Sequence, residues 1–293
     1  MLTRRALLAA LSAACLAPPL AAQDRSGGPA RYPLFDDPPD THALTRFDMT
    51  VEGQGYRMFM AIPTGAPSAE GWPSLWMLDG NAAFDRLGAG DLRRHAGLAV
   101  IGIGYPVDER FDTTARALDY TPASAVPDTE TARGRPTGGA DAFRARLTGP
   151  LRRAVGERAP LDPARRVLWG HSYGGLFTLH CLLSQPLAFA GWVAASPSSS
   201  FGGGVLHRMA ATAPHLPPGR TAPLRILLGD SEHRRGSAPP DGPRPSPQTL
   251  ALAELLGRRT DLDVQLTVLK GLGHGETFAA TFPQAMALAA GRD

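Results

Sequence analysis

The chain has 293 residues, of which 43% are hydrophobic and 19% charged, the usual balance of a globular protein with enough apolar material for a core. Its formal net charge is +3, and the absence of a dense basic tract or nucleic-acid motif argues against a nucleic-acid partner. The two cysteines, Cys15 and Cys181, are too few for a cysteine-based metal site.

Residues 1–22 have the pattern of an export signal. Two arginines at positions 4 and 5 precede an apolar segment over 6–16, and small residues follow. Residues 3–8 also partly resemble a twin-arginine signal. The apolar run is too short to span a bilayer comfortably, so we expect a periplasmic or otherwise exported protein without a stable membrane span, with an uncleaved anchor as the alternative.

The first half of the chain alternates apolar strands with helical stretches. After an irregular Pro- and Gly-rich arm, it predicts an antiparallel hairpin, a strand, a helix and a further strand, over 45–51 with 56–62, 74–78, 82–95 and 98–103. Residues 105–139 are polar and show no periodicity. Such a long insertion is typical of a binding loop or lid.

The second half continues the alternation, with a helix over 140–157 and strands over 165–169, 191–195, 224–228 and 264–269. This order predicts an α/β-hydrolase fold, in which a mostly parallel central sheet is covered by helices on both faces. We expect residues 23–293 to form one domain, with the reactive side chains at the carboxyl edge of the strands.

Residues 170–174 read Gly-His-Ser-Tyr-Gly and lie between an apolar strand and an apolar helix. This is the pattern of a nucleophile elbow, which predicts Ser172 as the nucleophile. We expect Gly170 and Gly174 to be needed because side chains there would collide with the tight turn.

The histidine at position 274 follows the last predicted strand and is flanked by glycines, where the base for Ser172 should lie. His233 is its one serious rival. Three carboxylates lie in the loop after the penultimate strand, and we select Glu232 as the orienting acid over Asp230 and Asp241. In the alternative, all three are solvated loop side chains, and serine and histidine work without an acid.

An oxyanion hole needs two N–H groups directed at the reacting carbonyl. The elbow provides the N–H of Tyr173. The second should come from the turn after the strand over 74–78, from Gly80 or Asn81, although the same turn could simply cap a helix.

Several segments together resemble the periplasmic siderophore esterases of the putative esterase superfamily, above all the trilactone hydrolases that act on enterobactin and its glucosylated form, salmochelin. Asp119-Tyr120-Thr121-Pro122 is the most specific match. The resemblance covers most of the chain, in six segments over 76–82, 118–123, 138–144, 168–177, 195–198 and 272–278.

The resemblance implies Ser172 as nucleophile and His274 as base, in a family whose periplasmic members are thought to use a Ser-His dyad. It also implies a catecholate siderophore substrate, free or chelating iron, held by cationic side chains. Arg116 is the first candidate for that role, followed by Arg133 and Arg135. No cofactor and no protein-bound metal are expected.

Two other functions stay open. Within the same chemistry, the substrate could be another acyl ester, such as a feruloyl-type ester, a thioester or a polymer ester. In a different class, the fold could be a non-catalytic protein that binds a catecholate.

Overall fold

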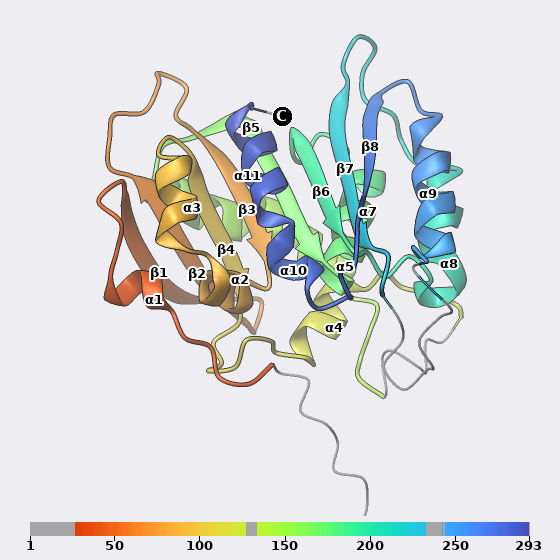
Figure 1. Ribbon diagram of the computed structural model, residues 1–293, viewed down its shortest axis with the longest axis horizontal. Coiled ribbons are helices and arrows are strands. Elements are labelled where there is room, and N and C mark those ends of the chain that lie inside the picture. The colour runs from red at the N-terminus through yellow and green to blue at the C-terminus, as the bar shows by residue number, and fades with distance from the viewer. Residues whose placement is uncertain (1–26, 127–133, 233–241, 243, 293) are drawn as a thin grey trace, which may run out of the picture.

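The computed structural model describes residues 27–126, 134–232, 242 and 244–292. In this part of the chain one eight-stranded sheet has the order β1-β2-β4-β3-β5-β6-β7-β8 (Figure 1). The strands are β1 (His42–Val51), β2 (Gln54–Pro63), β3 (Trp72–Leu78), β4 (Ala99–Gly104), β5 (Leu161–His171), β6 (Gly191–Ala195), β7 (Ala222–Gly229) and β8 (Leu262–Leu269). β2 is antiparallel to β1 and β4, and the other neighbours are parallel, which confirms the expected sheet.

Helices cover both faces of the sheet (Figure 1). One face carries α1 (Pro33–Asp36), α2 (Gly80–Arg86), α3 (Ala89–Arg94), α10 (Thr277–Ala280) and α11 (Phe282–Ala290). The other carries α4 (Ala115–Tyr120), α5 (Ala140–Arg146), a π-helical turn (Leu147–Leu151), α6 (Arg152–Gly156), α7 (Tyr173–Ser184), α8 (Phe201–Ala210) and α9 (Pro247–Gly257).

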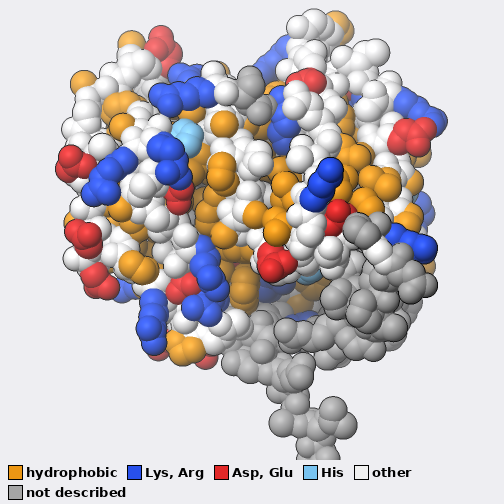
Figure 2. Space-filling view, in the orientation of Figure 1, with side chains coloured by type: hydrophobic (Ala, Val, Ile, Leu, Met, Phe, Trp, Pro, Cys, Tyr) orange, Lys and Arg blue, Asp and Glu red, His pale blue; other side chains and the backbone are white. Residues whose placement is uncertain are grey.

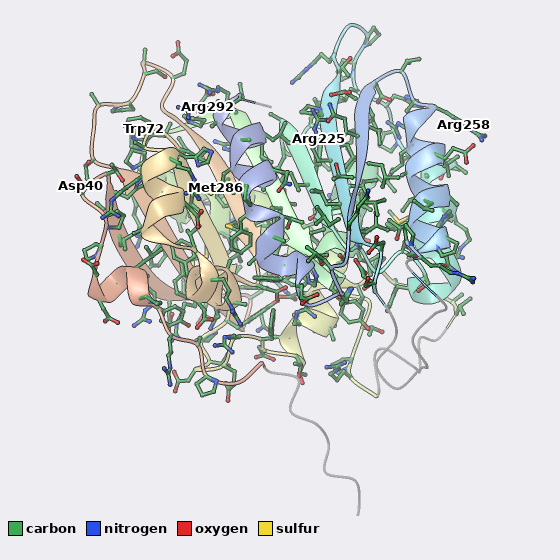
Figure 3. The ribbon with its side chains drawn as sticks, viewed as in Figure 1. Asp40, Trp72, Arg225, Arg258, Met286 and Arg292 are labelled. Atoms are coloured by element: carbon green, nitrogen blue, oxygen red, sulfur yellow. The ribbon has the colours of Figure 1, made fainter. Side chains whose placement is uncertain are left out.

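The sheet separates two apolar cores. Along β3, Trp76 and Leu78 face the core under α7, whereas Leu75 and Met77 face the core under α11, and all four are fully buried. Central strands buried on both faces must be apolar at nearly every position, which is why the sequence shows them as continuous apolar runs. Met286 of α11, labelled in Figure 3, belongs to the second core.

The predicted elements differ from the structure in three places. The expected helix over 82–95 is wrong, because the chain is extended at Leu87 and Gly88 and forms two short helices instead. The insertion over 105–139 is not wholly irregular, since it contains α4. The helix expected over 140–157 contains a π-helical turn around Pro150, whose nitrogen has no hydrogen to donate to the preceding turn.

The carboxyl ends of the parallel strands meet at one edge of the sheet, the lower edge in Figure 1. A cavity of about 210 Å³ lies at the opposite edge, beside Trp72 and Arg292 (Figure 3), away from the predicted catalytic residues. No helix in the described ranges is long and apolar enough to cross a bilayer.

Candidate active site

Ser172 lies between the end of β5 and the start of α7, as the elbow pattern predicts. Its φ of 59° and ψ of −115° are strained for a residue with a side chain. A Cβ at Gly170 would lie 2.3 Å from the carbonyl oxygen of Gly174, and one at Gly175 would lie 2.9 Å from that of Ala195. A Cβ at Gly174 would meet only ordinary contacts from 3.5 Å, so our expectation of a collision there is wrong.

Three side chains from distant parts of the sequence form a line of hydrogen bonds at this elbow. The Ser172 Oγ lies 3.0 Å from Nε2 of His274, and Nδ1 of His274 lies 2.9 Å from Oε2 of Glu232. The imidazole can accept a proton from the hydroxyl at Nε2 while its Nδ1–H is held by the carboxylate. This is the arrangement needed to activate a serine hydroxyl.

Both oxygens of the Glu232 carboxylate have hydrogen-bond partners. Oε1 accepts hydrogen bonds from the backbone N–H of Gly229 and the hydroxyl of Ser196, both at 2.6 Å, and Oε2 faces His274. Burial alone would raise the pKa of Glu232, but the hydrogen bond and charge of His274, with the other two donors, lower it below its usual value. Glu232 is therefore ionised at neutral pH.

The other predicted acids are placed differently. The Oδ1 of Asp230 accepts the N–H of Gly271 at 2.7 Å and the hydroxyl of Ser231 at 3.1 Å. Asp230 thus fixes the start of the loop that carries His274, a supporting role that we did not expect. Asp241 and the rival base His233 lie outside the described residues.

Backbone N–H groups at two helix N-termini lie near the elbow. Tyr173 is the first residue of α7, and Gly80 and Asn81 are the first two residues of α2. Their N–H groups therefore have no hydrogen-bond acceptor within the helix. The side chain of Asn81 faces away, since its Oδ1 accepts the N–H of Tyr105 at 3.0 Å and its amide donates to the carbonyl of Val107 at 3.1 Å. Only the backbone of Asn81 is available to an oxyanion.

Asp79, which precedes α2, has a left-handed backbone with φ 52°. Two bonds from Arg116, of 2.8 and 2.9 Å, hold its carboxylate, and its N–H donates to the hydroxyl of Tyr120 at 3.1 Å. The Arg116 guanidinium also packs against the ring of Tyr173, 5.6 Å from its centroid. The cation that we expected to contact substrate therefore already has an anionic partner in the protein.

The remaining predicted cations are less defined. Arg135 is half-buried in the insertion, and Arg133 lies outside the described residues. In the described ranges, no three or more His, Cys, Asp or Glu side chains group in a way that could hold a metal ion.

Sequence reasoning missed four residues that surround the line of hydrogen bonds: His171, Ser196, Ser198 and Thr277. The Ser198 Oγ lies 3.5 Å from that of Ser172, and the Nε2 of His171 lies 2.8 Å from the carbonyl oxygen of His274. All four lie in segments that carry the family resemblance, which was the available signal. The contact of Ser198 with Ser172 spans 26 residues and that of His171 with Thr277 spans 106, so periodicity could not reveal them.

Comparison with known proteins gives consistent results. The family model described as "Putative esterase" matches residues 51–236. The chain is 34% identical over 263 residues to the apo-salmochelin esterase of Escherichia coli O6:H1 (strain CFT073), covering 83% of this chain and 77% of the relative. It is 29% identical to the ferri-bacillibactin esterase BesA of Bacillus subtilis, covering 72% and 77%.

Solved structures agree. The enterobactin and salmochelin hydrolase IroE matches with a TM-score of 0.70 and 30% identity, covering 88% of this chain and 99% of that one. Its complex with DFP matches with a TM-score of 0.72 at the same identity and coverage. From the match over most of its length and the fold described above, the chain belongs to this esterase family and is a serine esterase with an α/β-hydrolase fold.

Proposed function

We propose that this esterase hydrolyses the ester bonds of catecholate siderophore trilactones, of the enterobactin and salmochelin type, outside the cytoplasm. The line of hydrogen bonds from Ser172 through His274 to Glu232 is the observation that carries the chemistry. The names of the relatives in Escherichia coli and Bacillus subtilis support the substrate class.

In the first half of the reaction, the Ser172 Oγ attacks a lactone carbonyl carbon while Nε2 of His274 takes the hydroxyl proton. Glu232 keeps the imidazole in the Nδ1–H form and stabilises the imidazolium. The negative charge on the former carbonyl oxygen is held by the N–H of Tyr173 and by that of Gly80 or Asn81.

In the second half, the carbon–oxygen bond of the lactone breaks, and His274 returns its proton to the departing alkoxide. Cleavage of one ester in a ring opens the ring and leaves the product attached to Ser172 as an acyl ester. Water, deprotonated by His274, then attacks that ester, and the released Ser172 oxygen regains a proton from the imidazolium.

For substrate binding, we propose a division of roles among the three arginines. Arg116 is paired with Asp79, so we assign it to holding the turn before Gly80 and to lining the site next to Tyr173. Arg133 and Arg135, in the insertion, are the proposed cations for catecholate oxygens, since guanidinium groups both pair with anions and stack on aromatic rings.

We also propose export to the periplasm, directed by residues 1–22, with residues 23–293 as one mature domain. The support is the pattern of residues 4–16, two arginines followed by an apolar segment. Cell fractionation tests the export, and amino-terminal sequencing of the purified protein tests the removal of residues 1–22. Protein confined to the cytoplasm would contradict the first statement, and a start at residue 1 would contradict the second.

The substrate is tested by comparing hydrolysis of enterobactin, with and without iron, with hydrolysis of p-nitrophenyl acetate. We expect a clear preference in kcat/KM for the trilactone and a fall of at least about a thousandfold in Ser172→Ala. No preference for the trilactone would contradict the siderophore proposal and favour another acyl ester.

A fluorophosphonate probe separates the esterase from a non-catalytic binder. We expect covalent labelling of the wild-type protein and none of Ser172→Ala or of heat-unfolded protein. A wild-type chain that binds the siderophore but is not labelled would show that the pocket only binds.

A further inference from the structure

Ser196 directly follows β6 and has an unusual backbone. Its φ is +41°, in the left-handed region that favours glycine, and the residue is 3% exposed. Its N–H donates to the carbonyl of Leu227 on β7 at 2.6 Å. A strained residue with a buried polar side chain persists where its surroundings fix it, and such positions cluster at functional sites.

The Ser196 hydroxyl bridges the acid and the base loop. It donates to Oε1 of Glu232 at 2.6 Å and lies 2.6 Å from Oγ1 of Thr277. Because Gly229 also donates to Oε1, this oxygen has two donors, and Oε2 is left to His274. The hydroxyl thereby decides which carboxylate oxygen faces the imidazole.

The number of available protons limits which group donates each hydrogen bond among His171, Thr277 and Ser196. The single Thr277 hydroxyl proton has the Ser196 Oγ and the His274 carbonyl oxygen at 2.8 Å as acceptors in reach, and also the Nε2 of His171 at 3.1 Å when that nitrogen carries no proton. The Nε2 of His171 lies 2.8 Å from the same carbonyl, and burial lowers the pKa of His171 well below its usual value, so this ring is neutral with one N–H. If His171 donates to the carbonyl, Thr277 can donate to Ser196 and Ser196 to Glu232.

The turn over residues 195–198, which carries Ser196, also contacts the nucleophile Ser172. The Ser198 N–H donates to the carbonyl of Ser172 at 3.1 Å, and the N–H of Ser172 donates to the carbonyl of Ala195 at 3.0 Å. Residues 195–198 therefore contact the nucleophile on one side and the acid on the other. A shift of this turn would move both ends of the line of hydrogen bonds.

We propose that Ser196 is a positioning residue for the esterase reaction, which holds Glu232 so that Oε2 faces His274, with Thr277 and His171 fixing Ser196 and the main chain of His274. This inference rests on the proposed roles of Ser172, His274 and Glu232. It adds a second layer of buried hydroxyl and imidazole groups behind them, and hydrogen-bonded partners of this kind determine how well a site keeps its geometry.

The test uses Ser196→Gly, because glycine adopts the observed φ without strain and removes only the hydroxymethyl group. We expect kcat on p-nitrophenyl acetate to fall about ten- to a hundredfold, the range for losing one hydrogen bond to a charged group, with KM within about twofold. The variant should stay folded at the assay temperature, since relief of the backbone strain at residue 196 offsets part of the cost of the lost hydrogen bonds. Ser199→Ala is the matched control, since Ser199 is buried in the same turn but bonds to Thr249 and does not contact the site.

A double-mutant cycle with Glu232→Gln distinguishes positioning from general support. If Ser196 acts through Glu232, then Ser196→Gly should change kcat less than about twofold in the Glu232→Gln background. Equal effects in both backgrounds, or wild-type kcat in Ser196→Gly, would overturn the proposal.

If Ser196→Gly is unstable, Thr277 gives a second test. Thr277→Val keeps the shape but removes the hydroxyl, so kcat should fall, and Thr277→Ser should restore it. Equal rates in both variants would overturn the proposal. The failure of the proposed function is separate, because it would appear as equal activity of wild type and Ser172→Ala, or as no preference for the trilactone.

Discussion

Glu232 decides whether this esterase works with two or three catalytic side chains. The family resemblance implies a dyad, yet here the carboxylate lies 2.9 Å from Nδ1 of His274, and its pKa is lowered by His274, Ser196 and Gly229 against the effect of burial. An ionised carboxylate in this position holds the imidazole tautomer that can accept the serine proton. The geometry therefore favours a triad.

Replacing this carboxylate by an amide should be costly. We expect Glu232→Gln to lower kcat about a hundred- to ten-thousandfold with little change in KM, because an amide can donate to Nδ1 and turn the imidazole toward the wrong tautomer. Single-turnover kinetics with p-nitrophenyl acetate measure the acylation step. A fall of less than about tenfold would indicate that Ser172 and His274 act as a dyad.

The hydroxyl group of Tyr120 provides a test of the proposed oxyanion hole. It accepts the N–H of Asp79, just before the N–H groups of Gly80 and Asn81 that we assign to the oxyanion. Tyr120→Phe removes this acceptor, and we expect kcat to fall about tenfold while KM is unchanged, since the oxyanion exists only after attack.

The matched control is Tyr56→Phe. Tyr56 is also a buried tyrosine, and its hydroxyl donates to Asp119 at 3.0 Å rather than to the turn at Asp79. If both variants lower kcat equally, the loss comes from the aromatic core and not from the turn before Gly80.

Among the secondary-structure elements, the junction of β5 and α7 leaves no room for a side chain at Gly170. A Cβ at Gly170 would lie 2.3 Å from a backbone oxygen of Gly174, and backbone atoms in a packed turn cannot move aside. We expect Gly170→Ala to unfold the protein or to lower its melting temperature by roughly 5 to 10 °C, from about 3 kcal/mol of overpacking. Calorimetry and circular dichroism measure this.

Gly156 at the end of α6 is the control glycine. No atom lies within 4 Å of a Cβ built there, so Gly156→Ala should leave stability unchanged or raise it by up to about 1 kcal/mol. If the two alanine variants melt at the same temperature, the elbow is more adaptable than its packing indicates.

Element prediction from the sequence succeeded where the apolar pattern is strong. Residues 191–195 were predicted as a strand with the bounds of β6, and the hairpin of β1 and β2 turns between the two strands predicted over 45–51 and 56–62. It failed at Leu87 and Gly88, where a continuous helical pattern is interrupted by an extended pair. It also did not anticipate the left-handed backbone of the three glycines at 202–204 in α8, because glycine allows that conformation without requiring it.

Across the whole molecule, the sequence predicted which strand ends carry the proposed catalytic residues but not what surrounds them. Ser172, His274 and Glu232 follow strands β5, β8 and β7, and the order of strands alone brings these ends to one edge. The pairing of Arg116 with Asp79 depends instead on where an insertion folds back. Figure 2 shows charged side chains of both signs scattered over one face, as the small net charge suggests.

Asp119 lies in the segment that resembles the family most specifically. Its buried carboxyl group makes the stability of the folded protein depend on pH. It is 1% exposed and accepts hydrogen bonds from Tyr56 at 3.0 Å and Tyr105 at 3.2 Å, with Arg146 at 3.7 Å. Burial raises its pKa to about 6, against these partners, from an ordinary 3.8. The folded protein therefore keeps a proton on Asp119 at pH values where the unfolded chain has lost it.

The sign of the effect on stability follows. Protonated Asp119 favours the folded state most below pH 4, and this contribution is lost as the pH rises from about 4 to about 6, by up to about 3 kcal/mol. Asp261 and Glu232, with lowered pKa values, act in the opposite direction, since their contributions are lost as the pH falls. The wild-type profile alone would mix these effects.

Asp119→Asn isolates the buried acid, because asparagine stays neutral at every pH and can still accept from Tyr56 through its amide oxygen. The free energy of unfolding in urea, measured for both proteins from pH 4 to pH 7.5, should shift in favour of the variant by up to about 3 kcal/mol as the pH rises to 6, and then level off. A difference that is constant over this range, or that moves in favour of the wild type, would mean that Asp119 is ionised in the folded protein from pH 4 upward, held by Arg146 and the two tyrosine hydroxyls.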